Sequence, residues 1–450
     1  MDPSQPWLLF TKWSKRYGHL TFLDIRQRVL IINSLSVARE LLEKRASKFS
    51  GRPETPSMRL YGWGFTTALL DDTDRWRQHR RFHQQGFRPE AALSWRPFQL
   101  QKAHILLLNL LASPEQMVDH VATFSASIIM AATYGYNTLP HKDPMVDLVN
   151  RATAVFTQNT SIINVACFTM FPFLVHLPMW LPGLSFYRNA SVSRDLARKM
   201  LDIPFEYVKK SMADGSAEPS LASEFLSRSR EAGGDEFLEE ELIKEVAASG
   251  LTAGIDTTSS VLVAFFLAMA MHPKVQERAQ AEIDEVVGRG RLPNFNDRAS
   301  LPYVEAILRL AHTATEDDVY DGMFIPQKTI IMVNVWAIGH DESRYEDPNT
   351  FNPSRFLTPE GNLNDDNIHY IYGFGRRICP GRHLADASQW IAVASILAVF
   401  QIRKAKNEHG EDVEIVPQFS SGLVTRPAPF KCEIVPRSVE SEELARTPQS

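Results

Sequence analysis

A cysteine in a loop rich in glycine and arginine is the group in this sequence best suited to metal chemistry. Cys379 lies in the segment IYGFGRRICPGRHLA, and Pro380 follows it at a position that suits the start of a helix. The free backbone N–H groups at such a helix start favour a thiolate over a thiol. Gly375 and Gly381 would let a flat, bulky group approach the sulfur, and the arginines could bind carboxylates. These features suit a haem with two propionates and a cysteine ligand to its iron.

Other chemistries suit this loop less well. A lone cysteine is most often a small apolar core residue, and a lone Gly-x-Gly is weak evidence for a ligand. Zinc would need a tetrahedral set, and Cys379 with His383 supplies only two candidate ligands. Covalent attachment of haem would need Cys-x-x-Cys-His, which this sequence lacks.

A second group of polar residues lies in the middle of a long apolar stretch. Residues Phe237 to His272 contain no proline, which predicts a helix roughly 50 Å long. The residues of interest at its centre are Ala253, Gly254, Asp256 and Thr257. One interpretation is a tolerated kink, with Thr257 bonded to its own backbone. The other is a groove where dioxygen binds, with room left by Ala253 and Gly254 and with Asp256 and Thr257 relaying protons.

Trp76 and Arg80 are four residues apart in the basic stretch DDTDRWRQHRRFHQQGF. On one helix face, an indole N–H and a guanidinium can converge on one carboxylate. Taken alone, the simpler interpretation is an exposed basic helix anchored by one tryptophan. The preceding loop contains Trp63, Phe65, Thr66 and Thr67. These side chains could contact a ligand or simply pack in the loop, and we expect ligand contact.

The cysteine loop closely resembles the haem-binding signature of the cytochrome P-450 family of haem-thiolate monooxygenases. The residues that match it are Tyr372, Gly375, Arg377, Cys379 and Gly381. The family usually has Phe at the first of these positions, and the tyrosine keeps the ring and adds a hydroxyl. The segment Ala253–Thr258 resembles the family's oxygen-binding helix. Trp76 with Arg80 resembles its helix that grips a haem propionate.

The resemblance covers almost the whole chain and implies a fold, a set of cofactors and residue roles. The implied fold is mainly α with a small β region (α+β), as a single cytochrome P-450 domain over residues 1–450. The implied cofactors are haem b, dioxygen (O2) and NADPH acting through a separate reductase. Cys379 would ligate the iron, and Asp256 and Thr257 would act in catalysis. Cofactor binding is implied for Trp76, Arg80, Ala253, Gly254, Tyr372, Gly375, Arg377 and Gly381.

The implied reaction inserts one oxygen atom of dioxygen into an apolar organic substrate. The segments PGRH and SSGLVTRP resemble fungal members of the family that oxidise secondary metabolites such as terpenoids or polyketides. NADPH–cytochrome reductase would supply electrons, with cytochrome b5 as an optional second donor. Arg75, Arg77 and Arg81 would add positive charge for such an acidic partner. A formal net charge of −5 argues against a nucleic-acid partner.

One family motif is incomplete. The segment Phe351–Phe356 is present, but the Glu-x-x-Arg with which its Arg355 would pair is missing near Leu310. We therefore expect a short internal deletion that leaves Arg355 as a buried, unpaired charge, at a cost of roughly 3–5 kcal/mol. Glu305 and Arg309 are four residues apart and could form a surface ion pair. The alternatives to an active monooxygenase are an impaired remnant of the family, and a haem-thiolate isomerase or peroxygenase.

Three features bear on location. No secretory signal or membrane-spanning run opens the sequence, which starts where the family's membrane anchor and hinge end. Residues 167–187 are very apolar but broken by prolines, so they could dip into a membrane interface or form a buried lid. We expect the cytosolic face of the endoplasmic reticulum membrane, with the cytosol as the alternative for a chain without an anchor. Residues 438–450 are expected to be a disordered, solvated tail.

Overall fold

The computed structural model describes residues 5–25, 27–53, 56–140, 142–159, 168, 171, 173, 185–232, 236–309, 329–366, 368–420 and 424–447. The expected deletion near Leu310 lies outside these residues. So does most of the apolar stretch 167–187.

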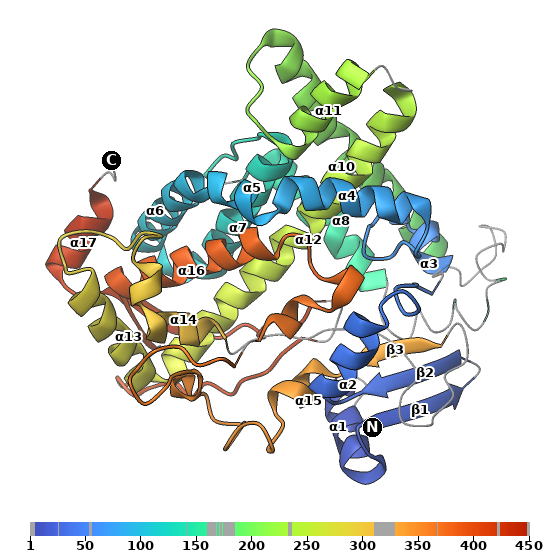
Figure 1. The fold of residues 1–450 in the computed structure, drawn as a ribbon. Helices are drawn as coiled ribbons and strands as arrows, with labels where there is room; N and C mark the ends of the chain where they lie inside the picture. The colour runs from blue at the N-terminus through green and yellow to red at the C-terminus, as the bar shows by residue number, and fades with distance from the viewer. Residues whose placement is uncertain are drawn as a thin grey trace.

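Helices make up most of the described chain, and two small sheets complete it, which confirms the predicted class (Figure 1). The helices of the first half are α1 (Pro6–Tyr17), α2 (Leu35–Arg39), η1 (Glu40–Lys44), α3 (Pro56–Leu60), α4 (Asp74–Phe87), α5 (Pro89–Ser94), α6 (Arg96–Ala112), α7 (Met117–Tyr134) and α8 (Pro144–Asn159). Those of the second half are α10 (Ser185–Asp214), α11 (Leu221–Ala232), α12 (Glu236–Met271), α13 (Pro273–Val286), α14 (Pro302–Leu308), α15 (Val335–Gly339), α16 (Arg382–Val399) and α17 (Val439–Arg446).

The strands β1 (Leu20–Ile25) and β2 (Gln27–Ile32) form an antiparallel hairpin. The strand β3 (Ile330–Val333) joins β2 in parallel, with Val29 opposite Ile330. This sheet lies to one side of the helices, next to α1 and α15 (Figure 1). A second, separate sheet pairs β4 (Phe400–Lys404) with β5 (Cys432–Pro436).

The helix α12 runs through the middle of the molecule and packs against α7, α4, α11 and α16 (Figure 1). Its 36 residues are apolar on several sides because neighbours cover most of its circumference. Within the part of the chain that the structure describes, it is also the one helix long and apolar enough to cross a bilayer, but 67% of that apolar window is buried inside the molecule. It therefore serves as a core helix that can carry residues into the interior.

The C-terminal tail requires a correction. Residues Val439–Arg446 form α17, so the expectation of a disordered segment over residues 438–450 is wrong for most of its length. Ser438 caps the helix by accepting the Ser441 N–H, and the Ser441 hydroxyl contacts the Ser438 backbone in return. Ala445 is fully buried against the core, and this packing offsets the polar character of the remaining residues.

Candidate functional site

The cysteine loop is closed by backbone hydrogen bonds and leads into α16. The Cys379 N–H donates to the Tyr372 carbonyl over 2.7 Å, and the Arg382 guanidinium donates to the Cys379 carbonyl over 3.0 Å. The helix begins at Arg382, two residues later than Pro380 predicts. The backbone N–H groups of Gly381 and Arg382 still approach the sulfur, as expected for a helix start. Part of the cysteine surface stays accessible.

The charge state of the sulfur differs from the prediction. Burial raises the pKa of the Cys379 thiol above its ordinary value. The N–H groups of Gly381 and Arg382 and the guanidinium of Arg80 lower that pKa, but burial outweighs them. The loop alone therefore favours a thiol. Because a metal binds the deprotonated sulfur, the proton would leave when the metal binds.

Trp76 and Arg80 reach the cysteine loop from α4. Arg80 Nη1 donates to the carbonyl of Ile378, the residue before the cysteine, over 2.7 Å. The Arg377 guanidinium lies 3.9 Å from the centroid of the Trp76 ring. Arg377 is also held by backbone carbonyls at both ends of the segment 50–70. The structure thus brings the three residues together, while their role toward a cofactor stays a prediction.

The basic surface of α4 is partly neutralised. Arg75 pairs with Glu245 over 2.5 Å. Arg77 pairs with Asp72, two residues before α4, over 3.2 Å and with Asp74 in the first turn over 2.8 Å. Arg81 is exposed and has no ion pair among the residues that the structure describes. The positive surface expected for an electron-transfer partner is therefore weaker than the count of arginines suggests.

One face of α12 is open at the centre of the molecule. Ala253 and Thr257 are exposed, although Ile255 and Thr258 beside them are buried. The Thr257 hydroxyl donates to the Ala253 carbonyl over 2.7 Å, as the interpretation without a ligand predicts. The Asp256 carboxylate forms an ion pair with Arg426 over 2.8 Å. Both predicted relay residues thus have protein partners, and Thr257 also faces open space.

Gly254 has a different role from the one expected. A Cβ at this position would lie 2.7 Å from Ile129 Cγ1 on α7, so its surroundings are filled. The Ser125 hydroxyl of α7 also donates to the Gly254 carbonyl over 3.0 Å. The expectation that Gly254 leaves room for substrate or oxygen is therefore wrong. Its missing side chain lets α12 and α7 pack closely.

The two loop glycines also differ. A Cβ at Gly375 would lie 2.0 Å from the Leu42 carbonyl oxygen, and the backbone φ of +49° is left-handed. Gly375 is therefore needed to pack the loop against η1, rather than to admit a flat group. At Gly381, a Cβ would meet no atom within 4 Å. This position borders open space beside the sulfur, as predicted.

Two predictions about charged residues are corrected. Arg355 is half-buried and donates to the carbonyls of Asp347, Thr350 and Asn352 over 2.9, 2.7 and 3.2 Å. Backbone acceptors thus satisfy it, and the penalty for a buried unpaired charge does not apply. Arg309 donates to backbone carbonyls of the segment 364–366 and forms no pair with Glu305.

Glu305 belongs instead to a cluster that the sequence analysis missed. The Arg298 guanidinium bridges Glu305 on α14 and Asp386 on α16, with N–O distances of 2.9 and 2.7 Å. The cluster fixes α14 to the helix that follows the cysteine. This cluster could not be predicted from sequence spacing, because Arg298 and Asp386 are 88 residues apart.

The aromatic residues before α4 pack into the core. Trp63 and Phe65 are 3% and 5% exposed, and the Trp63 ring stacks on Phe156 with centroids 4.3 Å apart. Ordinary packing is therefore the right interpretation for these two residues.

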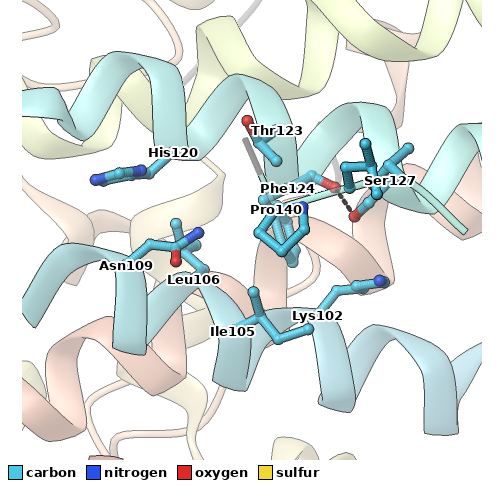
Figure 2. Close-up of a pocket in the computed structure, with 11 residues that line it drawn as sticks. Lys102, Ile105, Leu106, Asn109, His120, Thr123, Phe124, Ser127 and Pro140 are labelled. Carbon is cyan, nitrogen blue, oxygen red and sulfur yellow. Dashed lines mark hydrogen bonds between the residues drawn. The ribbon is translucent and has the colours of Figure 1, made fainter. Parts of the chain in front are cut away.

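A small cavity of about 30 Å³ lies between α6 and α7 (Figure 2). Its polar lining residues include Lys102, Asn109 and His120. None of the motif residues lines this cavity, so it is not part of the candidate site.

The residues present fit a haem. Within the described part of the chain, no group of three or more His, Cys, Asp or Glu side chains could hold a metal ion. A porphyrin brings its own ligands to the iron, so a haem would need only the Cys379 sulfur from this loop. Open space beside the sulfur at Gly381 and the guanidinium of Arg80 suit a flat ring with carboxylates.

Comparisons with known proteins agree with this site. The profile of the family described as Cytochrome P-450 matches residues 2–434. The cytochrome P-450 monooxygenase claR of Ampulloclitocybe clavipes is 37% identical over 463 residues, which cover 99% of this chain and 85% of the relative. The monooxygenase ple1 of Rhodocybe pseudopiperita is 34% identical over 464 residues, with coverage of 98% and 87%. The monooxygenase ppsD of Aspergillus oryzae is 36% identical over 456 residues, which cover 97% of this chain and 86% of the relative. The chain thus belongs to the cytochrome P-450 family of haem-thiolate monooxygenases.

Proposed function

We propose that this chain oxidises an apolar secondary metabolite of the terpenoid or polyketide type, with electrons from NADPH passed through a separate reductase. The fungal origin of its relatives supports the substrate class. The observation that carries the proposal is the open face of α12, where Ala253 and Thr257 are exposed within an otherwise buried helix. A bound haem would supply the chemistry that activates dioxygen.

The chain's own residues would hold the cofactor and move protons. Trp76 and Arg80 would bind a propionate, and Cys379 would bind the iron. The Thr257 hydroxyl now donates a hydrogen bond to the Ala253 carbonyl, and a rotation about its Cα–Cβ bond would present the hydroxyl to the open side, where it could pass on its proton. Asp256, one residue earlier, would resupply that proton.

Replacing Thr257 by alanine tests this assignment. We expect NADPH consumption to continue while product formed per NADPH falls about 10-fold or more, with the electrons appearing as peroxide. Ser260→Ala is the matched control, because the Ser260 hydroxyl makes the same kind of bond, to the Asp256 carbonyl over 2.6 Å, but is buried. Product and peroxide would be measured together in both variants. If both variants formed the same amount of product per NADPH, the assignment to Thr257 would be contradicted.

The ion pair between Asp256 and Arg426 gives a second prediction. Arg426 is 46% exposed, so its replacement by glutamine should change the free energy of unfolding by less than about 1 kcal/mol. The product formed per NADPH should change more clearly, because the Asp256 carboxylate loses the group that orients it. Thermal unfolding and coupling would be measured on the same preparation. Arg403→Gln on the exposed edge of β4 controls for loss of a surface charge.

We also propose that the chain works with NADPH–cytochrome reductase at the cytosolic face of the endoplasmic reticulum membrane, with cytochrome b5 as an optional donor. Support comes from the stretch 167–187, in which Phe171 and Phe173 are 41% and 58% exposed. Exposed aromatic rings suit a membrane interface. Flotation with phospholipid vesicles tests the membrane contact. The double variant Phe171→Ser/Phe173→Ser should no longer bind the vesicles. Equal flotation of the variant and the wild type would contradict the proposal.

A second candidate is a remnant that loads haem poorly. The alignment with claR spans 463 positions, more than the 450 residues of this chain, so that relative carries residues with no counterpart here. The reduced protein with carbon monoxide would separate the candidates. A red-shifted thiolate Soret band supports an enzyme, and a band that forms only after the corresponding segment of a relative is inserted at Leu310 supports the remnant.

A further inference from the structure

A chain of buried polar side chains joins α4 to α12, next to the site but outside the family motifs. We propose that the hydrogen-bonded chain Glu245–His79–Thr67–His83 fixes the rotation of α4 about its axis, and so positions Trp76 and Arg80 against the cysteine loop. The inference rests on the proposed haem-binding function and names Thr67 as its central positioning residue.

The hydrogen bonds link all four side chains without a break. The Thr67 Oγ1 atom lies 2.9 Å from His79 Nδ1 and 3.0 Å from His83 Nε2. His79 Nε2 lies 3.3 Å from Glu245 Oε2. The two imidazoles are 0% and 3% exposed, so water does not compete for these bonds. One hydroxyl therefore connects two histidines of α4 to a carboxylate of α12.

The hydrogen-bonded chain is also held at its centre and at its Glu245 end. At the centre, Thr67 N–H donates to Ser249 Oγ over 2.9 Å, and that hydroxyl donates to the Phe65 carbonyl over 3.3 Å. At the Glu245 end, Arg75 pairs with the carboxylate over 2.5 Å. Three segments are thus held together: α4, α12 and the residues before α4.

The positions of the hydrogen atoms follow from what each group can donate. The Glu245 carboxylate only accepts, so the hydrogen of His79 is assigned to Nε2, and its Nδ1 accepts the Thr67 hydroxyl. Thr67 Oγ1 then accepts from His83 Nε2, which leaves His83 Nδ1 as a bare lone pair. Among the residues that the structure describes, that nitrogen indeed has no hydrogen-bond partner. Burial lowers the pKa of His83 to about 3, consistent with a neutral ring.

The opposite assignment is unfavourable. If His79 Nδ1 carried a hydrogen, the Thr67 hydroxyl would have to donate to His83 Nε2. The remaining hydrogen of His83 would then sit on Nδ1 as a buried donor without an acceptor, which is unfavourable because the desolvated N–H gains no hydrogen bond in return. The chain therefore has one favoured direction, and each group holds its neighbour in one orientation.

Helix geometry connects this chain to the site. His79 and His83 lie one turn apart on α4, and Trp76 and Arg80 lie on the neighbouring part of its surface, with the mean directions of the two pairs roughly 60° apart. A rotation of α4 moves both faces together. Fixing the histidines against α12 therefore fixes the direction in which the Arg80 guanidinium meets the Ile378 carbonyl.

Thr67→Val tests the proposal, because valine keeps the shape and removes the hydroxyl. We expect haem to transfer to apomyoglobin about 10-fold faster than from the wild-type holoprotein, and Thr67→Ser to restore the wild-type rate. Thr133→Val is the matched control. Thr133 is 0% exposed, and its hydroxyl donates only within α7, to the Ile129 carbonyl over 2.6 Å.

A double-mutant cycle shows whether Thr67 acts through Arg80. In an Arg80→Leu background, Thr67→Val should add little further acceleration, because the group that it positions is gone. Equal acceleration by Thr67→Val and Thr133→Val, or full additivity with Arg80→Leu, would overturn the proposal.

Hydrogen exchange of the haem-free protein separates this inference from the proposed function. Thr67→Val should speed amide exchange in α4 relative to Thr133→Val, whether or not haem binds. Failure of the wild type to take up haem would refute the proposed function, and unchanged exchange in α4 would refute the positioning role on its own.

Discussion

Replacing Cys379 by serine is expected to remove the thiolate-ligated haem spectrum and to reduce oxidation of substrate to background. A serine hydroxyl is far harder to deprotonate than a thiol and is a poor ligand for haem iron. Burial already raises the pKa of the Cys379 thiol, so the loop alone does not stabilise an anion at this position. It would therefore not stabilise a serine alkoxide either. The measurement is the absorbance of the reduced carbon monoxide complex, with haem content determined separately.

The matched control is Cys432→Ser. Cys432 is a half-buried thiol on β5, and burial raises its pKa to about 11. It shares the chemistry of Cys379 without its place in the loop, so its replacement should leave the spectrum unchanged. A normal thiolate spectrum in Cys379→Ser would show that another residue binds the iron. The site built here would then be wrong.

Features encoded by neighbouring residues could be predicted from the sequence. The loop around Cys379 and the long helix through Thr257 depend on short spacings, on glycine and proline, and on apolar periodicity, all of which are local. The hairpin of β1 and β2 was predictable for the same reason. The cap of α17 was also present as Ser438 and Ser441, but the charged residues around it favoured a disordered tail.

Features that depend on distant neighbours could not be predicted. Gly254 could equally border a ligand or another helix, and only the position of Ile129 on α7 decides between them. Arg426 meets Asp256 across 170 residues of sequence, and no spacing rule points to that pair. The positioning role of Thr67 could not be predicted for the same reason, because it depends on hydrogen bonds with two histidines of another segment.

Gly375→Ala is expected to destabilise the protein by roughly 2–5 kcal/mol and to prevent stable haem binding. Alanine would have to adopt the left-handed φ of +49°, which costs about 1–2 kcal/mol. Its Cβ would also lie 2.0 Å from the Leu42 carbonyl oxygen, so the loop must move away from η1. That movement would carry Arg377 away from Trp76 and the carbonyls that hold it. Thermal unfolding with and without haem measures the effect.

Gly381→Ala is the matched control, and the pair separates two roles for glycine in one loop. Gly381 has an ordinary φ of −83°, and its Cβ would meet no protein atom within 4 Å. The free energy of unfolding of the haem-free variant should therefore lie within about 0.5 kcal/mol of the wild-type value. Any loss of haem affinity in this variant must then come from contact between the new methyl group and the cofactor. If Gly375→Ala unfolded like Gly381→Ala, the packing of the loop against η1 would not be what places the sulfur, and the position of Cys379 would have to depend on α16 alone.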